Sequence, residues 1–348
     1  MGERATIRDV AARAGVSVAT VSRVLAGTYP TSAASRAKVL RAAKDLDYVA
    51  NAHARALAGA GRKTIAVLML DVVSSFYAAV AQGVEMEAAR HERLTLVAST
   101  GADPARELAL VQMMREQAAE AVVLVGGVVE DDEYRARMAR YAQSLAAAGS
   151  RLVLCGRPAP APDVPALVVE YDNEAGAHAI TSHLLGAGHR RIAMIGYQPG
   201  NTTGEGRVRG CLRALADHGV PRSDVLLHDI GFGQNNGDRA IRELLDKCDG
   251  RPDFTAVVAG DDRVAAAVVK ALAEYGLRVP DDISVVGYND DPVAADMTPG
   301  LTTVHIPGEE LGRTAVRLAL GGSARTGQQR HLLGTHIVVR DSVRRLTP

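Results

Sequence analysis

Near the N-terminus, residues 18–25 include side chains that could form hydrogen bonds with a large polar partner. Apolar residues at positions 21, 24 and 25 recur at helical spacing and define the inner face of a helix. The outward-facing groups are those of Thr20, Ser22 and Arg23, preceded by the small apolar side chains of Val18 and Ala19. Hydroxyl and guanidinium groups hydrogen-bond phosphates and base edges, and apolar groups contact the methyl of thymine. This stretch therefore has the chemistry of a DNA contact.

Two short helices are needed to position these side chains. Thr6 is a candidate N-cap, and apolar residues follow it at positions 7, 10, 11 and 14, which is the spacing of one helical face. Gly15 supplies the permissive backbone of a tight turn, and Ser17 then caps the second helix. This pattern predicts a helix-turn-helix, whose second helix lies in the major groove of DNA. An ordinary pair of antiparallel helices is commoner in general, but the position and charge of the stretch favour the DNA-binding form.

The charge of the chain is distributed unevenly. The 348 residues include 40 Lys and Arg against 40 Asp and Glu, so the formal net charge is zero. Residues 1–63, however, contain 11 basic and 4 acidic residues, a net charge of +7, and the remainder therefore carries −7. We call residues 1–63 the head and the remainder the body. A basic head is typical of a module that binds phosphates, and an acidic body is typical of a part that does not bind nucleic acid itself.

The head also resembles a known family. The helix-turn-helix stretch is followed by a third predicted helix over Ser32–Leu46 and by the segment 48–57, and this order and spacing resemble the DNA-binding head of the LacI/GalR family of bacterial repressors. The words VSVATVSRV and NAHARAL are most similar to the galactose-repressor branch, and the resemblance extends across nearly the whole chain. It implies a double-stranded DNA operator with an inverted repeat, contacted in the head by Thr6, Ser17, Val18, Ala19, Thr20, Ser22 and Arg23.

Residues 51–62, between head and body, are interpreted as a hinge helix and linker. Asn51 can cap a helix and Gly59 can end it, but the eight residues between these signals are too few for a stable isolated helix in water. The family resemblance implies that the hinge folds against the minor groove and a second subunit's hinge, with Leu57 as a wedge between base pairs. From spacing alone, Leu57 could equally be a minor core residue. The implied hinge contacts are Asn51, His53, Ala54 and Leu57, and Ala50 stands where the family often has proline, which would leave this hinge less preorganised.

The body alternates short β-branched runs with helical segments from Lys63 onward. Continuous apolar strands separated by helices indicate parallel sheets that are covered on both faces. The predicted strands are Thr64–Asp71, Leu94–Thr100, Ala121–Gly127, Arg151–Gly156, Leu167–Asp172, Arg191–Tyr197, Thr255–Gly260 and Ile283–Asn289. The predicted fold class is therefore an N-terminal all-α helix-turn-helix domain followed by an α/β core.

The family resemblance implies that this core has two doubly wound parallel-sheet lobes, like those of periplasmic sugar-binding proteins, with a ligand cleft between them. We assign residues 1–50 to the helix-turn-helix domain, 51–62 to the hinge and linker, and 63–348 to the effector-binding and dimerisation core. The chain is expected to cross between the lobes near residues 164, 293 and 327. The first lobe would then hold residues 63–163 and 294–326, and the second 164–293 and 327–348.

Candidate ligand contacts lie where strands end, because open α/β sheets bind ligands at the carboxyl ends of their strands. That rule alone selects Asp71, Gly126, Tyr197, Asp261 and Asn289. The family resemblance adds an aromatic residue after the first strand and an arginine whose guanidinium can donate hydrogen bonds to two ligand hydroxyls at once. It also adds a second aromatic residue, which would serve as a platform for the ligand. The effector-binding residues that follow are Asp71, Phe76, Asn201, Thr203, Arg207, Phe232 and Asp261. The structural alternatives are a surface salt bridge for Arg207 and a helix N-cap for Asp261, and Gly156 stands where many relatives have an acidic ligand contact.

Other function classes find little support. The sequence lacks the motifs G-x-x-x-x-G-K-[ST], G-x-S-x-G and H-E-x-x-H of nucleotide-binding and hydrolytic enzymes. The three cysteines are far apart and the histidines lack metal-ligand spacing, so neither a metal nor another cofactor is expected. No apolar stretch has the length of a membrane span, and the N-terminus lacks a signal peptide, which favours a cytoplasmic protein.

We therefore predict a sequence-specific DNA-binding transcriptional regulator, a repressor, controlled by a small hydroxylated effector such as a sugar. The expected oligomer is a homodimer, with a tetramer as the alternative, because the chain ends without a heptad repeat. The competing functions are a sugar-binding protein and an α/β enzyme, each with an appended DNA-binding head. The sequence does not distinguish an inducer from a corepressor.

Overall fold

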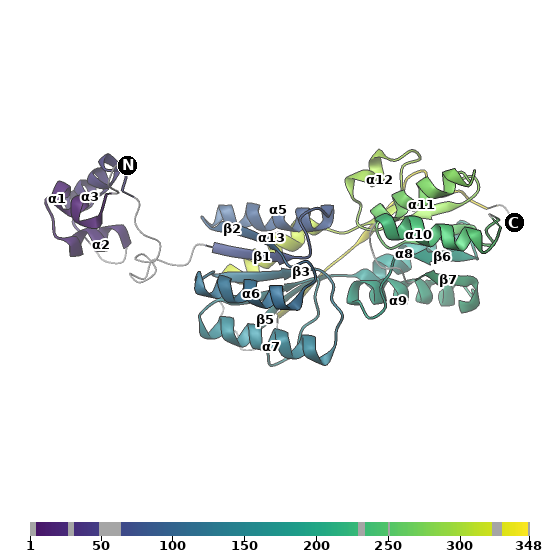
Figure 1. Cartoon of the computed structure of the whole chain (residues 1–348), viewed down its shortest axis with the longest axis horizontal. Coiled ribbons are helices and arrows are strands. Elements are labelled where there is room, and N and C mark those ends of the chain that lie inside the picture. Colours follow the sequence, from purple (N-terminus) through teal and green to yellow (C-terminus); the bar gives the residue numbers. More distant parts are fainter. Residues whose placement is uncertain are drawn as a thin grey trace. The chain divides into compact units, whose positions relative to one another are not determined.

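The structure, a computed structural model, describes residues 5–26, 31–48, 64–228, 234–249, 251–321 and 329–346. Contacts divide the chain into two compact units, residues 1–63 and 64–348 (Figure 1). The hinge candidates Asn51, His53, Ala54 and Leu57 and the predicted aromatic platform Phe232 lie outside the described residues.

Within residues 5–26 and 31–48, the N-terminal unit contains three helices, α1 (Ile7–Ala14), α2 (Val18–Ala26) and α3 (Ala33–Asp45). At the start of α1, the side chains of Thr6 and Asp9 accept hydrogen bonds from each other's backbone N–H groups, and Gly15 ends the helix with a left-handed φ of 66°. The Ser17 hydroxyl accepts a hydrogen bond of 3.1 Å from the backbone N–H of Thr20, which caps α2. The predicted N-cap, glycine turn and second cap are therefore confirmed.

A small apolar core holds these three helices together. Its buried side chains are Val10, Ala11, Ala14, Val21, Val24, Val39 and Ala42. Ser32, predicted as the first residue of the third helix, is instead its N-cap, and its hydroxyl accepts a hydrogen bond of 3.2 Å from the Ser35 N–H. Because Val21 and Val24 are buried in this core, the opposite face of α2 is left for contacts outside the unit.

The first lobe of the larger unit is a six-stranded parallel sheet in the order β11-β5-β4-β3-β1-β2. Its strands are β1 (Thr64–Met69), β2 (Leu94–Ser99), β3 (Ala121–Val125), β4 (Arg151–Cys155), β5 (Ala166–Tyr171) and β11 (Gln329–Leu333). One face is covered by α6 (Pro104–Glu116) and α7 (Asp132–Ala147), and the other by α5 (Ser75–Arg90) and α13 (Gly308–Leu320). Successive residues of a strand point to opposite faces, so Leu68 packs toward α6 and α7 whereas Val67 packs toward α5 and α13.

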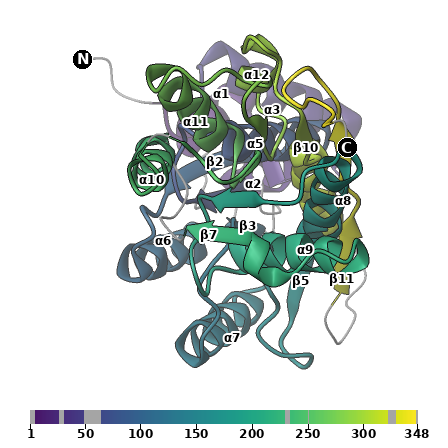
Figure 2. The same cartoon turned by 90° about the vertical axis from the view of Figure 1, so that its right-hand side faces the viewer.

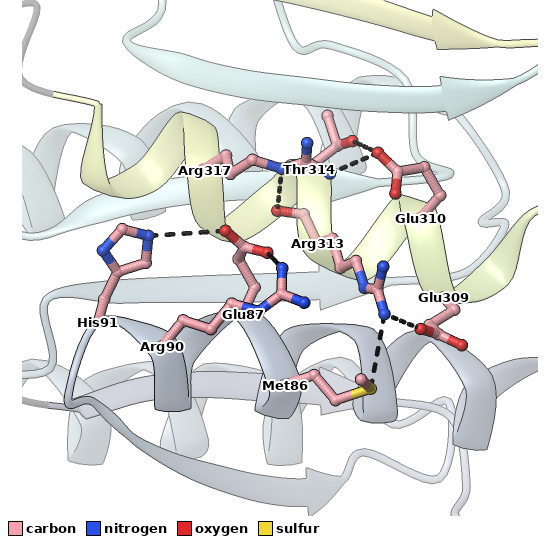
Figure 3. A network of polar contacts seen from close by, with 9 residues as sticks. All are labelled: Met86, Glu87, Arg90, His91, Glu309, Glu310, Arg313, Thr314 and Arg317. Carbon is pink, nitrogen blue, oxygen red and sulfur yellow. Dashed lines mark hydrogen bonds and ion pairs between the residues drawn. The ribbon is translucent and has the colours of Figure 1, made fainter.

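Helices α5 and α13 lie side by side and approach each other very closely. A Cβ atom at Gly83 would lie 1.9 Å from the carbonyl oxygen of Glu309, so only glycine allows this approach. Figure 3 shows the polar network over the two helices, in which Arg313 pairs with Glu309 and also reaches the sulfur of Met86, 3.7 Å away on α5. The two helices are thereby held together as one layer against the sheet.

The second lobe is a four-stranded parallel sheet in the order β7-β6-β8-β9. Its strands are β6 (Ile192–Ile195), β7 (Val225–His228), β8 (Ala256–Ala259) and β9 (Ser284–Val286). Helices α8 (Asn173–Gly186) and α9 (Thr202–Asp217) cover one face, and α10 (Gln234–Asp246) and α11 (Asp262–Glu274) cover the other (Figure 2). The 3-10 helix η1 (Arg222–Asp224) precedes β7, and the short helix α12 (Pro292–Asp296) follows β9. The predicted fold class, a helical head and an α/β core with two parallel-sheet lobes, is confirmed.

The crossings between the lobes differ from the predicted positions near residues 164, 293 and 327. The sequence places β5 in the second lobe, but β5 pairs in parallel with β4, with Leu152 opposite Ala166, and so belongs to the first sheet. Strand β11 extends the same sheet beyond β5. The chain therefore crosses after Tyr171, between β10 (Thr303–His305) and α13, and after Leu333. An apolar run does not specify the sheet that it joins, because backbone hydrogen bonds to distant strands decide its pairing.

Each of the eight predicted apolar runs overlaps an observed strand. The strands without a predicted run include β10 and β12 (His336–Val338), which are only three residues long and form an antiparallel pair of their own. Among the helices that the structure describes, none combines the length and the apolar composition needed to cross a membrane.

Candidate functional site

The face of α2 that the head core leaves free presents most of the side chains predicted to contact DNA. Those of Ser17, Val18, Ala19 and Arg23 are exposed, and those of Thr20 and Ser22 are half-buried. Val18 is 42% exposed although it is apolar, so its methyl groups are available for contact outside the unit. Thr6, in contrast, uses its hydroxyl within the head, where it donates to Asp9 Oδ2 at 2.7 Å, and this hydrogen bond lowers the pKa of the Asp9 carboxyl.

A cavity of about 820 Å³ lies between the two lobes of the larger unit. Its lining comes from the ends of strands in both sheets and from the loops and helix starts that follow them. Six of the seven predicted effector contacts line this one cavity: Asp71, Phe76, Asn201, Thr203, Arg207 and Asp261. The seventh, Phe232, falls outside the described residues.

Arg207 of α9 is the most enclosed cation on the second-lobe wall, with 4% of its surface exposed. Its guanidinium donates to Asn173 Oδ1 at 3.0 Å, to Asn289 Oδ1 at 3.3 Å, and to the carbonyl of Gly260. The guanidinium carbon also lies 3.7 Å from the centroid of the Tyr288 ring, a cation–π contact. Arg207 is therefore a fixed cation of the cleft wall, and the alternative of a surface salt bridge is wrong.

Three buried carboxylates, those of Asp261, Asp262 and Asp291, lie near one another at the start of α11. Asp261 lines the cleft and also N-caps α11, since its Oδ1 accepts a hydrogen bond of 2.7 Å from the Val264 N–H. Asp262 is fully buried and accepts hydrogen bonds from the Thr303 hydroxyl at 2.6 Å and from the Asp291 N–H at 2.7 Å. Burial raises the pKa of the Asp262 carboxyl to about 7, against the lowering effect of these two hydrogen bonds. Asp262 thus ties the start of α11 to α12 and to β10.

Replacing Asp262 with asparagine is expected to change how stability depends on pH. The carboxyl has a pKa of about 7 in the folded protein and ~3.9 in the unfolded chain, so the folded protein binds the extra proton between these values. This group should therefore add stability as the pH falls from about 7 toward about 4, by at most about 1.4 kcal/mol per pH unit. The contribution is lost in Asp262→Asn. Urea unfolding of both proteins between about pH 5 and pH 8 measures it, and parallel pH profiles would contradict the assignment.

The first lobe contributes an aromatic wall to the cleft. Phe76 packs edge-on against Tyr77 and Tyr171, with ring centroids 5.4 and 5.6 Å away. Tyr77 occupies the space over Gly126, which has a left-handed φ of 100°; a Cβ atom there would lie 2.5 Å from the Tyr77 hydroxyl. Burial raises the pKa of the Tyr77 phenol well above its usual range, so the group stays neutral. Asp71 shapes the same wall by accepting two backbone hydrogen bonds, each 2.8 Å long, from the loop that follows it.

Two loops touch across the cleft, one from each lobe. Val129 and Asn201 form an antiparallel bridge, and Thr202 N–H donates to the carbonyl of Val128 at 2.9 Å. The Thr202 hydroxyl accepts in return from the Val128 N–H at 3.2 Å. Asn201 also caps α9, since its Oδ1 accepts a hydrogen bond of 3.1 Å from the Thr203 N–H. Asn201 and Thr203 therefore line the cavity at a point where the lobes are in direct contact.

Sequence profiles of known families match both units of the chain. The profile described as bacterial regulatory proteins, lacI family, matches residues 6–51, and that of the periplasmic binding protein-like domain matches residues 181–343. The HTH-type transcriptional regulator DegA of Bacillus subtilis (strain 168) is 32% identical, over 97% of this chain and 98% of its own length. The chain belongs to the LacI family of bacterial regulatory proteins. As a LacI-family member it is a DNA-binding transcriptional regulator, which confirms the function class predicted from the helix-turn-helix.

Other LacI-family proteins are similar along their whole length. The HTH-type transcriptional regulator CelR of Thermobifida fusca is 34% identical over 97% of this chain and 98% of its own length. The solved structure of the CelR–cellobiose complex is 33% identical, with a TM-score of 0.69 and coverage of 97% of this chain and 100% of that one. The lac repressor dimer bound to operator and the anti-inducer ONPF matches the fold at 24% identity, with a TM-score of 0.81 and coverage of 98% of this chain and 100% of that chain.

Several cleft residues of this LacI-family regulator are missing from the predicted contacts. They are Tyr77, Arg137, Arg157, Tyr171 and Arg263, whereas Asn289, which the strand-end rule selected, also lines the cleft. Asn289 ends a predicted strand, and its φ of 112°, rare for any residue but glycine, marks a constrained position. No local sequence pattern identifies Arg157 as a cleft residue, because its partner in the cleft wall, Glu107, lies 50 residues away in the sequence.

Proposed function

We propose that this regulator is a homodimeric repressor whose binding to an inverted-repeat operator is controlled by a sugar, or a similar polyhydroxylated effector, in the cleft between the lobes. It acts in the cytoplasm, where the operator lies. The cleft serves binding rather than chemistry, and neither a cofactor nor a reaction is part of the proposal.

The side chains of the cleft support a polyhydroxylated effector. Arg207 and Asp261, which are 4% and 6% exposed, offer a fixed donor and a fixed acceptor on the second lobe. A hydroxyl group both donates and accepts, so a sugar can use both partners, while Phe76 offers an apolar surface for a sugar ring. The cavity of about 820 Å³ falls within the range of roughly 300–1,000 Å³ typical of small-molecule sites. The relative CelR was solved as a complex with cellobiose.

The position of the cleft supports control of DNA binding. A ligand that touches both lobes favours the arrangement in which it makes both sets of contacts, and it shifts the equilibrium only by its differential affinity for the two states. Rotation of one lobe against the other would change the spacing of the two hinge segments in a dimer, and with it the fit to two half-sites.

A two-step experiment tests this function. The full chain is first screened by thermal shift against monosaccharides and disaccharides, because a ligand that binds only the folded state raises the melting temperature. Operator affinity is then measured by fluorescence anisotropy with each stabilising sugar. A sugar that stabilises the protein and changes operator affinity supports the proposal. Turnover of a stabilising sugar would favour an enzyme instead, and stabilisation with unchanged operator affinity would favour a plain sugar-binding protein.

The start of α2 provides a prediction about base recognition. Val18 and Ala19 cannot hydrogen-bond through their side chains, so we expect them to contact thymine methyl groups in the major groove. Val18→Asn should therefore change the preferred base at one position of each half-site, by roughly 1–3 kcal/mol of discrimination. The control is Lys38→Ala on α3, whose exposed side chain is expected to contact phosphates and should leave the base preference unchanged. Selection from randomised sites measures both, and equal preferences of Val18→Asn and the native protein would refute the assignment.

The edge strand β2 supports the proposed dimer. It ends the six-stranded sheet, and its apolar side chains Leu94, Leu96 and Val97 are 65%, 37% and 47% exposed. Natural proteins usually cover or charge such an edge, because its open backbone groups and apolar side chains attract other chains. We place a second copy of this chain on β2, in line with the dimer seen for the lac repressor on operator.

A further inference from the structure

The interlobe cavity extends past the aromatic wall to a second polar end in the first lobe. Its lining there comes from the starts of α6 and α7 and from the loop after β4: Asp103, Glu107, Asp131, Glu133, Arg137 and Arg157. None of these residues belongs to the effector contacts proposed above. The cavity of about 820 Å³ is also near the upper end of the range for small-molecule sites, roughly 300–1,000 Å³, and so has room for more than one sugar ring.

A buried ion pair forms the base of this end. Arg157 and Glu107 are 5% and 6% exposed, and Arg157 Nη1 donates to Glu107 Oε2 at 2.7 Å. The Arg157 Nη2 also donates to the carbonyl of Val125 at 3.4 Å. Because each charge is balanced by the other, the pair is a fixed support whose removal on one side would leave an uncompensated buried charge.

Arg137 of α7 is held much less closely. Its Nε lies 3.6 Å from Glu107 Oε1 and its Nη1 lies 3.7 Å from Glu133 Oε1, distances that are too long for hydrogen bonds. Within the described residues its guanidinium has ion pairs but no hydrogen bond, although only 16% of the side chain is exposed. The buried Nε of Arg137 has no hydrogen-bond partner, which costs free energy, and its Nη groups donate no hydrogen bond to any of the described residues. A molecule in the cleft can supply the acceptors.

The charges at this end favour a neutral ligand group. Four carboxylates line it, against two guanidiniums, and the carboxylates are those of Asp103, Glu107, Asp131 and Glu133. A phosphate or a carboxylate on the ligand would therefore meet more like charges than opposite ones. A hydroxyl fits better, since it can accept from Arg137 and donate to a neighbouring carboxylate.

We propose that this end of the cleft is a second sugar subsite, and that Arg137 selects neutral effectors of two or more rings over monosaccharides. One ring lies at Arg207, the chain of the effector passes along the aromatic wall, and hydroxyls of the next ring accept hydrogen bonds from Arg137. This inference rests on the proposed function, because it specifies which sugars the same cleft prefers.

Calorimetric titration of the full chain with matched sugars tests the proposal. The probes are glucose with cellobiose and maltose, galactose with lactose and melibiose, and glucuronate and glucose 6-phosphate as anionic controls. In the native protein we expect at least one disaccharide to bind about tenfold or more tightly than its monosaccharide, as a hydrogen bond to a charged group allows. Arg137→Ala should reduce this preference to near unity, whereas Arg140→Ala, which removes an exposed arginine of the same helix, should retain it.

Two further measurements keep the result interpretable. Arg137→Lys preserves the positive charge beside Glu107 but not the planar set of guanidinium donors. This variant should therefore fold as the native protein does and still lose most of the preference for disaccharides. Operator affinity without sugar should be unchanged in all variants. Tighter binding of monosaccharides or anionic sugars than of disaccharides, or a preference that survives in both Arg137 variants, would overturn the inference while leaving a sugar-controlled regulator intact. If no sugar binds at all, the proposed function fails and the second subsite with it.

Discussion

Replacing Arg207 with alanine is expected to remove most of the response to an inducer while leaving operator affinity without effector close to the native value. The guanidinium is buried and held by Asn173 and Asn289 at the cleft wall. A hydrogen bond to such a charged group contributes ~1.5–3 kcal/mol, so effector affinity should fall about tenfold to a hundredfold. If the effector is a corepressor, the same variant should fail to bind operator even when the effector is present.

Operator affinity across an effector titration measures this outcome. Asp261→Ala should behave like Arg207→Ala, because both side chains line the second-lobe wall of the cavity. The matched control is Arg209→Ala on the same helix, whose exposed side chain pairs with Glu174 and does not line this cavity. A native response in both Arg207→Ala and Asp261→Ala would place the effector elsewhere.

Placing a lysine at Val97 is expected to separate the dimer and to weaken operator binding by about a hundredfold or more. Val97 is 47% exposed on the edge strand β2, and a charge on each copy would face the other across the proposed contact. Two linked heads engage two half-sites with a high effective concentration, which raises the overall affinity by roughly 10²–10⁴ over that of one head. Sedimentation velocity and operator titration measure the two effects together.

The opposite edge of the same sheet offers the control. Leu332 on β11 is also an apolar side chain on an edge strand, and it is 54% exposed. Because the proposed dimer contact lies on β2 and not on β11, Leu332→Lys should leave both the dimer and the operator affinity unchanged. Dissociation of the dimer by Leu332→Lys, with Val97→Lys still dimeric, would move the proposed interface to the other edge.

The helix-turn-helix could be predicted in detail because local interactions specify it. Thr6 and Asp9 cap one helix from positions three residues apart, Ser17 caps the next in the same way, and Gly15 makes the turn between them. Each of these signals depends on residues within a few positions of one another. The parallel-sheet core was predictable for a similar reason, since runs of buried apolar residues between helices are visible along the chain.

The side chains that line the cleft could be predicted only in part. The ends of strands are visible in the sequence, which is how Asp71 and Asp261 could be selected, and Arg207 was selected from the family resemblance. Three residues after Arg207 stands Gly210, where a Cβ atom would lie 2.1 Å from the carbonyl oxygen of Glu174. This glycine lets α9 pack closely on α8 while Arg207 faces the cleft. Local sequence therefore carried information about the side chains nearest to strand ends and helix starts.

The sequence by itself determined the helical head, the α/β class of the core and the main candidates on the second-lobe wall. The tertiary structure alone decided that β5 and β11 join the first sheet, that Tyr77 fills the space over Gly126, and that Arg157 meets Glu107 behind Arg137. These features depend on hydrogen bonds and packing between residues far apart in the chain. Periodicity and capping patterns reflect only near neighbours, so no local pattern could have specified which distant strand or side chain each residue would meet.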